Sequence, residues 1–221
     1  MQCLAMDVAI PIFDRLTALD AVGPYEVLSR VPGVRVRFIA ERPGEYRTEQ
    51  GSLGLTADAS LDDVPAPEII VVPGGMGTRA LLGEGPLLDW VRRAHATSQW
   101  TTSVCTGSLV LGAAGLLRGL EATTYWGALD LLAGFGAVVV ERRVVEQGKV
   151  ITAAGVSAGI DMALVLAAKL AGDQVAQAIQ LGIEYDPQPP FDSGSLRKAS
   201  PEVVAMARGG AGTGRQQART S

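Results

Sequence analysis

Cys105 lies where a β-rich run gives way to small residues and then to an apolar helical pattern. Residues 100–104 read Trp-Thr-Thr-Ser-Val, and the helical pattern begins at residue 108. A sharp strand-to-helix turn pushes its central side chain out of the backbone, and the free N–H groups of the new helix stabilise a thiolate. The alternative is a buried structural cysteine. The turn, together with a glycine-rich loop earlier in the chain, favours a nucleophile.

That loop, residues 73–77, follows an apolar run and reads Pro-Gly-Gly-Met-Gly. Glycines let backbone N–H groups approach a ligand closely, but neither a P-loop nor a full dinucleotide fingerprint is present. A simple tight turn is the alternative. Because the carboxyl ends of parallel strands share one crevice, we expect the N–H groups of Gly75 and Thr106 to lie beside the Cys105 sulfur as oxyanion-hole-like donors.

The acid/base partner of such a thiol is not a histidine. The only histidine, His95, follows two arginines in a helical pattern and is expected on its exposed face, so a Cys–His mechanism lacks its base. Asp20 follows the first strand and could face the crevice, or it could cap a helix opening near residues 23–24. Glu26, one turn further on, is expected to point elsewhere.

The elements that must position these groups alternate between strands and helices. Short β-branched runs predict five strands, and apolar residues at helical spacing predict three helices. The predicted strands are 8–12, 34–40, 69–72, 101–104 and 150–152, and the predicted helices are 86–96, 108–117 and 156–170. This alternation predicts an α/β sandwich with a mainly parallel sheet covered on both faces.

Three further segments carry local predictions. Residues 46–59 are expected to form a small hairpin beside the sheet, and residues 138–145 a further strand. Pro11 marks a strand end or a bulge, because proline cannot donate to the ladder. Residues 1–208 are expected to form a single domain, and 209–221, without apolar periodicity, a flexible tail.

Composition narrows the class of protein. The chain has 221 residues, 48% hydrophobic and 19% charged, which suits one globular domain. Two cysteines without paired spacing argue against disulfides and zinc, and so favour a reducing, cytoplasmic setting. No secretory signal or membrane span is visible. A net charge of −4 and a pI near 5.1 give no footprint for nucleic acid, so small molecules are the expected partners.

Four sequence blocks together resemble the ThiJ/PfpI superfamily, and the likeness runs from about residue 7 to residue 191. They are residues 20–25, 73–75, 103–117 and 158–161. The cysteine block is the most specific for the superfamily. Over the whole length, and at Asp20, the chain is most similar to the isonitrile-hydrating members.

The resemblance implies a flavodoxin-like three-layer α/β/α sandwich, a homodimer, and roles for individual residues. Cys105 would be the nucleophile, Asp20 the acid/base, Thr106 an assisting neighbour and Gly75 a backbone donor. The pocket would be shaped by Val156, Ala154, Tyr125 and Trp126. Many relatives carry His where this chain has Tyr125, which disfavours peptidase- or amidase-like hydrolysis.

The implied activity is addition of water to an isonitrile, R–NC, to give an N-substituted formamide, without a metal or an organic cofactor. Cys105 would attack the electrophilic carbon while protonated Asp20 delivers a proton, and the thioimidate would then be hydrolysed. The alternatives are glyoxalase- or deglycase-like chemistry and a non-enzymatic redox sensor with a reactive thiol. A DNA-binding regulator is not expected, since little chain follows the domain.

Overall fold

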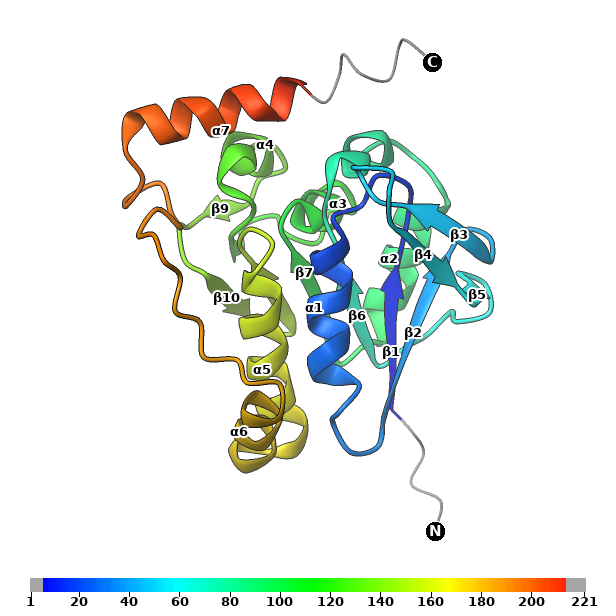
Figure 1. The fold of residues 1–221 in the computed structure, drawn as a ribbon. Coiled ribbons are helices and arrows are strands. Elements are labelled where there is room, and N and C mark those ends of the chain that lie inside the picture. Colours follow the sequence, from blue (N-terminus) through cyan, green and yellow to red (C-terminus); the bar gives the residue numbers. More distant parts are fainter. Residues whose placement is uncertain (1–5, 214–221) are drawn as a thin grey trace. The chain divides into compact units, whose positions relative to one another are not determined.

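A seven-stranded sheet lies at the centre of the computed structural model, which describes residues 6–213 (Figure 1). The strand order is β10-β11-β7-β6-β1-β2-β5, and every neighbouring pair is parallel except β10 with β11. The strands are β1 (Met6–Pro11), β2 (Val34–Ala40), β5 (Ala59–Ser60), β6 (Ile69–Val72), β7 (Trp100–Val104), β10 (Val144–Gln147) and β11 (Val150–Ala153). The predicted mainly parallel α/β sheet is therefore confirmed.

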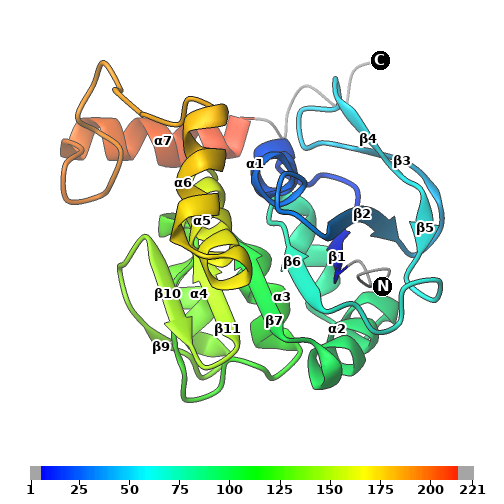
Figure 2. The same cartoon turned by 90° about the horizontal axis from the view of Figure 1, so that it is seen from below.

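Helices cover both faces of this sheet. In Figures 1 and 2, α1 (Ala18–Leu28) and α5 (Ala158–Ala171) lie on one face, and α2 (Pro86–Thr97) and α3 (Gly107–Ala113) on the other. Helix α6 (Asp173–Gly182) packs against α5, and α4 (Leu129–Gly134) packs against α3. Helix α3 ends earlier than the predicted residue 117, because Gly115 adopts a φ of 85° that terminates the helical path.

Two small sheets lie outside the main one. Strands β3 (Gly44–Arg47) and β4 (Gly54–Ala57) form an antiparallel hairpin within the predicted region, although β5 pairs with β2 in the main sheet. The predicted strand over 138–145 is wrong. It is split into β9 (Val138–Val139), which pairs with β8 (Glu121–Ala122), and β10, which pairs with β11. The charged residues 141–143 separate the two.

The core explains why the strands could be recognised. All four residues of β6 and the last four of β1 are buried, as expected for a parallel sheet covered on both faces. Pro11 is the last residue of β1, which confirms the strand-end interpretation.

The chain forms two compact units, residues 1–185 and 186–221. In the second unit, α7 (Pro201–Thr213) is preceded by Ser200, whose hydroxyl accepts the Val203 N–H at 3.4 Å. Residues 209–213, the start of the predicted flexible tail, continue α7, although the adjacent Gly209 and Gly210 are poor helix formers. Residues 214–221 and Cys3 lie outside the described part of the chain. The single domain over 1–208 stays a prediction.

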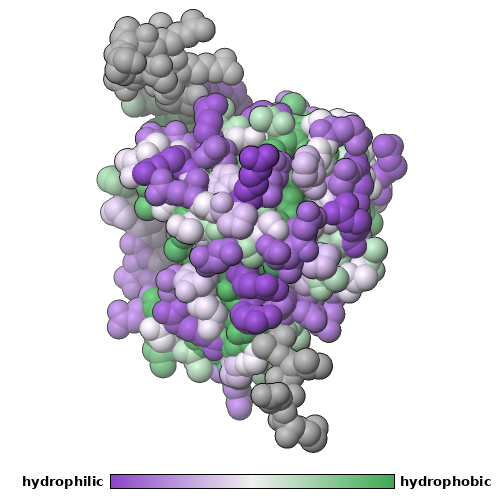
Figure 3. Space-filling view, turned by 90° about the vertical axis from the view of Figure 1, so that its right-hand side faces the viewer, coloured by the Kyte–Doolittle hydropathy of each residue, from purple (hydrophilic) through white to green (hydrophobic). Residues whose placement is uncertain are grey.

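One face of the molecule is drawn in space-filling form in Figure 3. On the face shown in Figure 3, hydrophilic residues predominate and apolar residues form small, separated areas. Among the described residues, no helix is both long and apolar enough to cross a bilayer.

Candidate active site

Cys105 occupies the turn between β7 and α3, with a φ of 55° that a non-glycine residue rarely adopts. Its N–H donates to the carbonyls of Ala153 and Ala154 at 3.1 and 2.9 Å. Its own carbonyl accepts the hydroxyls of Thr124 and Ser108 at 3.0 and 3.1 Å. Contacts at both ends of the residue thus hold a strained conformation, as in a nucleophile elbow.

Asp20 lies in the first turn of α1, is fully buried, and faces the same end of the sheet. Its Oδ2 accepts the Gly74 N–H at 2.9 Å, while Oδ1 has no hydrogen bond of ordinary geometry to any described residue. Helix α1 begins at Ala18 after Thr17, so the alternative in which Asp20 caps a helix near residue 23 is wrong. Glu26 pairs with Arg30 and points elsewhere, as predicted.

The glycine loop comes close to both functional side chains. A Cβ added to Gly74 would lie 2.5 Å from the Thr106 nitrogen and 2.8 Å from Asp20 Oδ2, which explains why a glycine is needed there. The Gly75 N–H donates to the Thr106 hydroxyl at 2.9 Å, and that hydroxyl donates to the Gly75 carbonyl at 3.1 Å. The prediction that Gly75 offers its N–H beside the Cys105 sulfur is therefore wrong, because the Thr106 hydroxyl oxygen already accepts that N–H.

Two other backbone donors face the thiol. The N–H groups of Thr106 and Val156 both stabilise the ionised sulfur of Cys105. Thr106 therefore serves twice, since its N–H faces the sulfur while its hydroxyl holds the glycine loop. Val156 was expected only to shape the pocket, and its backbone adds a contact that sequence could not reveal.

Burial dominates the electrostatics of the pair. It raises the pKa of Asp20 to about 7, opposed by the Gly74 N–H and the Cys105 thiol and reinforced by the negative charge of Glu49. Burial, and then the charge of Asp20, raise the pKa of Cys105 to about 12 against the donation from Thr106 and Val156. Burial therefore opposes the thiolate stabilisation that the N–H groups at the start of α3 provide.

The walls of the site come from two segments. Ala154 accepts the Cys105 N–H, and the Tyr125 ring lies 3.2 Å from the position of a Cβ on Gly155. Burial, the Cys105 thiolate and Glu49 raise the pKa of Tyr125, so its phenol stays neutral near pH 7. The half-buried Trp126 ring lies 5.2 Å from the Tyr125 ring, centroid to centroid.

Glu49 is a site residue that the sequence did not reveal. It is exposed on the β3–β4 connection, where its carboxylate accepts the Met76 N–H at 3.2 Å and the Thr17 hydroxyl at 3.3 Å. Thr17 precedes α1, which carries Asp20, and Met76 follows the glycine loop. No local pattern marks Glu49, because a hairpin far along the chain brings it there.

His95 lies at the opposite end of β7 from Cys105. It is half-buried rather than solvated as predicted, because its Nδ1 bonds the Thr101 hydroxyl at 2.8 Å. Burial, and secondarily Lys149, lower its pKa. The expectation that His95 is not the base for Cys105 agrees with this position.

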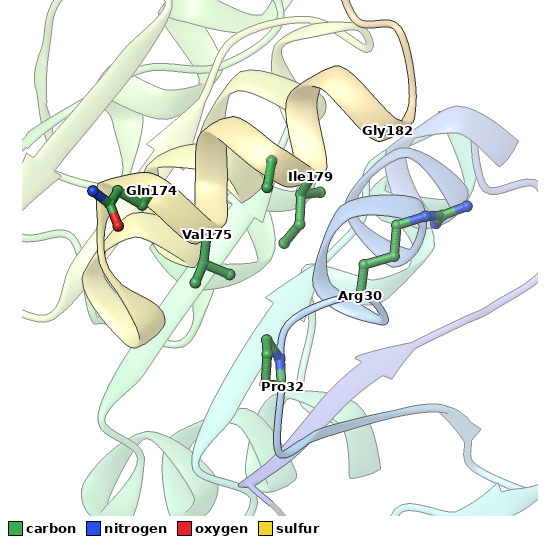
Figure 4. A pocket seen from close by; sticks show the side chains of 7 residues that line it. Arg30, Pro32, Gln174, Val175, Ile179 and Gly182 are labelled. Carbon is green, nitrogen blue, oxygen red and sulfur yellow. The ribbon is translucent and has the colours of Figure 1, made fainter.

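A shallow groove of about 390 Å³ opens beside α6 (Figure 4). Arg30 and Pro32, which both follow the end of α1, lie across from the α6 residues that complete its lining, Gln174, Val175, Ala178, Ile179 and Gly182. None of the predicted site residues lines this groove.

Comparisons with known proteins agree with the fold. Residues 6–169 match the DJ-1/PfpI family. The chain is 44% identical to an isonitrile hydratase of Pseudomonas putida, over 93% of this chain and 90% of that protein. It is 36% identical to a THiJ/PfpI family protein from Pseudomonas syringae of known structure, with a TM-score of 0.89 over 95% and 88% of the two chains. It is 27% identical to the Drosophila melanogaster protein dj-1beta over 72% of this chain and 86% of that one.

Proposed function

Because this chain belongs to the DJ-1/PfpI family, and because Cys105 faces a cation-free buried carboxyl, we propose that it is an isonitrile hydratase. It would convert R–NC and water into an N-substituted formamide, R–NH–CHO. The observation that carries the proposal is Asp20, whose pKa of about 7 suits both accepting and returning a proton at neutral pH. The likeness to the Pseudomonas putida isonitrile hydratase supports the choice of substrate.

The first step forms a carbon–sulfur bond. The ionised Asp20 carboxylate takes the Cys105 proton, and the sulfur attacks the terminal isonitrile carbon, which is electrophilic. Asp20 then returns the proton to that carbon. The product is a thioimidate, R–N=CH–S, with Asp20 again ionised. The N–H groups of Thr106 and Val156 stabilise the transient thiolate during this step.

The second step breaks that bond. Asp20 takes a proton from water as the water oxygen attacks the thioimidate carbon, and then passes that proton to the imine nitrogen. The C–S bond of the resulting R–NH–CH(OH)–S adduct then breaks, and Asp20 transfers the hydroxyl proton to the departing Cys105 sulfur. The sum is R–NC plus water giving R–NH–CHO, so the chain's own residues account for every proton without a metal or an organic cofactor.

The pocket walls fit this chemistry. A neutral Tyr125 phenol supplies no base for hydrolysing peptides or amides, and the Tyr125 and Trp126 rings would line the space for R together with Val156 and Ala154. The raised pKa of the buried thiol weighs against the redox-sensor alternative, since oxidation-sensing cysteines are exposed and readily ionised.

The test is direct. Purified protein is incubated with an aryl isonitrile, and formamide formation is followed by absorbance, alongside Cys105→Ala. We expect multiple turnovers that disappear in the variant. Absence of turnover with aryl and alkyl isonitriles, from a folded wild-type protein, would refute the proposal.

We also propose that the protein works in the cytoplasm as a homodimer. Light scattering coupled to size-exclusion chromatography tests the assembly. A mass of twice 23.0 kDa is expected, and a monomer at assay concentration would contradict it.

A further inference from the structure

Four polar side chains gather behind the loop that faces Cys105. Arg143, just before β10, donates its Nε to Asp161 Oδ2 at 2.7 Å, and Tyr185 donates its hydroxyl to the same oxygen at 3.1 Å. The Arg143 guanidinium also reaches the Ser157 hydroxyl at 3.2 Å and the Tyr185 hydroxyl at 3.4 Å. Asp161 lies in the first turn of α5, so the cluster joins β10, α5 and the segment after α6.

This cluster holds both ends of a short loop. The Arg143 carbonyl accepts the Ala154 N–H at 2.9 Å, and the Arg143 guanidinium holds Ser157. Between them lies Val156, whose φ of 29° is rare for a β-branched residue. A backbone in such a conformation persists only where its surroundings determine it.

The same loop contacts the nucleophile twice. The Ala154 carbonyl accepts the Cys105 N–H at 2.9 Å, and the Val156 N–H faces the Cys105 sulfur. The contacts therefore run without a break from Tyr185 and Asp161, through Arg143, to the reactive thiol.

We propose that Arg143 is a positioning residue, which Asp161 and Tyr185 orient so that it holds the 154–157 loop with the Val156 N–H directed at the Cys105 sulfur. The inference rests on the proposed function in that Cys105 is taken as the reacting group. It adds a residue set that lies outside the pocket and touches neither substrate nor sulfur.

A neighbouring ion pair provides a matched control. Lys169 and Glu146 also join α5 to β10, with Nζ and Oε1 2.8 Å apart. The side chains of this pair are 30% and 40% exposed, against 50% and 33% for Arg143 and Asp161. The Lys169–Glu146 pair makes no contact with residues 154–157 among the described hydrogen bonds. If ion pairs between α5 and β10 only stabilise the fold, breaking either pair should therefore have the same effect on the Cys105 thiol.

The experiment measures thiol reactivity independently of isonitrile turnover. In a Cys3→Ser background, the rate of Cys105 alkylation by iodoacetamide at pH 8 is compared for the parent, Arg143→Met, Arg143→Lys and Glu146→Gln, with kcat/KM for an aryl isonitrile measured in parallel. Removing one aligned hydrogen-bond donor from a thiolate lowers the reaction rate of that thiolate by about tenfold. We expect Arg143→Met to lose about tenfold in both rates, Arg143→Lys to recover part of that loss, and Glu146→Gln to match the parent.

The outcomes separate this inference from the proposed function. Parent-like alkylation in folded Arg143→Met, or an equal loss in Glu146→Gln, overturns the positioning role. If Arg143→Met does not fold, Tyr185→Phe decides, with a two- to threefold loss expected and an unchanged rate contradicting. If the parent turns over no isonitrile but the alkylation pattern holds, the hydratase proposal fails and the positioning role stands.

Discussion

Asp7 and Asp20 are two carboxylates beside β1, one near its start and the other in the helix that follows it. Asp7 binds Arg35 at 2.7 Å and Arg37 at 2.7 Å, and 18% of its side chain is exposed. The hydrogen bond from Arg35 holds the pKa of Asp7 below its usual range, aided by Arg37 and opposed by burial. Asp20 is fully buried, no cation of residues 6–213 acts on its pKa, and that pKa rises to about 7.

The difference shows how one sheet supports two kinds of aspartate. Two arginines of β2, Arg35 and Arg37, keep Asp7 of β1 charged, so that it joins the two strands and has no proton to exchange near neutral pH. Asp20 accepts one backbone N–H, from Gly74, and interacts with the Cys105 thiol. These two interactions lower its pKa by less than burial raises it. The proposed mechanism requires such a carboxyl, one that can both take and release a proton near neutral pH.

The largest expected contrast is in rate. Asp20→Asn should lower kcat/KM for isonitrile hydration by about two to four decades, the range for a lost acid/base group. Asp7→Asn should leave it within about twofold, since surface ion pairs contribute little and Asp7 is remote from the thiol. Steady-state formamide assays measure both. Equal losses in the two variants, or unchanged turnover in Asp20→Asn, would remove Asp20 from the mechanism.

The second contrast is in stability, with opposite signs. A raised folded-state pKa means that the folded protein binds a proton more tightly, so Asp20 lowers stability progressively from about pH 4 to pH 7. Asp20→Asn should therefore increase the free energy of unfolding at pH 8 by up to about 4 kcal/mol, with the gain shrinking toward pH 4. Asp7→Asn should lower it by about 1 kcal/mol at pH 8. Urea unfolding at both pH values checks this, and a destabilised Asp20→Asn at pH 8 would contradict it.

The third contrast compares two glycines, Gly74 beside the candidate site and Gly83 in open space. Gly74→Ala places a methyl group against the Thr106 nitrogen and Asp20 Oδ2, and must displace one of them. A displacement near 1 Å in an active site typically lowers kcat/KM by about a hundredfold. Gly83→Ala, where an added Cβ meets no atom within 4 Å, is the matched control and should leave the rate unchanged. A fully active Gly74→Ala would show that the close approach is dispensable.

The smallest effect is a shift in the pH profile. Since Asp20 must be ionised to take the thiol proton, kcat/KM should rise with pH through about 7. Glu49→Gln removes a charge that raises the pKa of Asp20, so the rising limb should move to lower pH, by less than about one unit for an exposed group. Glu45→Gln, on the same hairpin and paired with Arg47, should leave the limb in place. A limb unmoved by Glu49→Gln, or moved equally by both variants, would contradict the role of Glu49.

The features that the sequence predicts correctly are those that a short run of neighbouring residues determines. The apolar run 69–72 predicted β6, and the break after residue 104 predicted the elbow that carries Cys105. Because the carboxyl ends of parallel strands share one crevice, the sequence also predicted that Asp20, Thr106 and the glycine loop lie close together.

The errors arose where the outcome depends on orientation or on distant packing. Two adjacent amides follow Pro73, and only the fold decides that Gly74 serves Asp20 while Gly75 serves Thr106. The direction of the thiol pKa depends on burial by the whole sheet, which a helix N-terminus does not reverse here. Glu49 and Val156 come from segments far along the chain from Cys105, so no local motif marks them.

Titration of the Asp20 carboxyl carbon by ¹³C NMR is the most direct test of the contrast between the two aspartates. The Asp20 signal is assigned by its absence in Asp20→Asn, and the Asp7 signal by its absence in Asp7→Asn. We expect a midpoint near pH 7 for Asp20 and one below the usual range for Asp7. A midpoint near 4 for Asp20, in folded protein, would contradict it, because so weakly basic a carboxylate would not take the Cys105 proton on which the proposed first step depends.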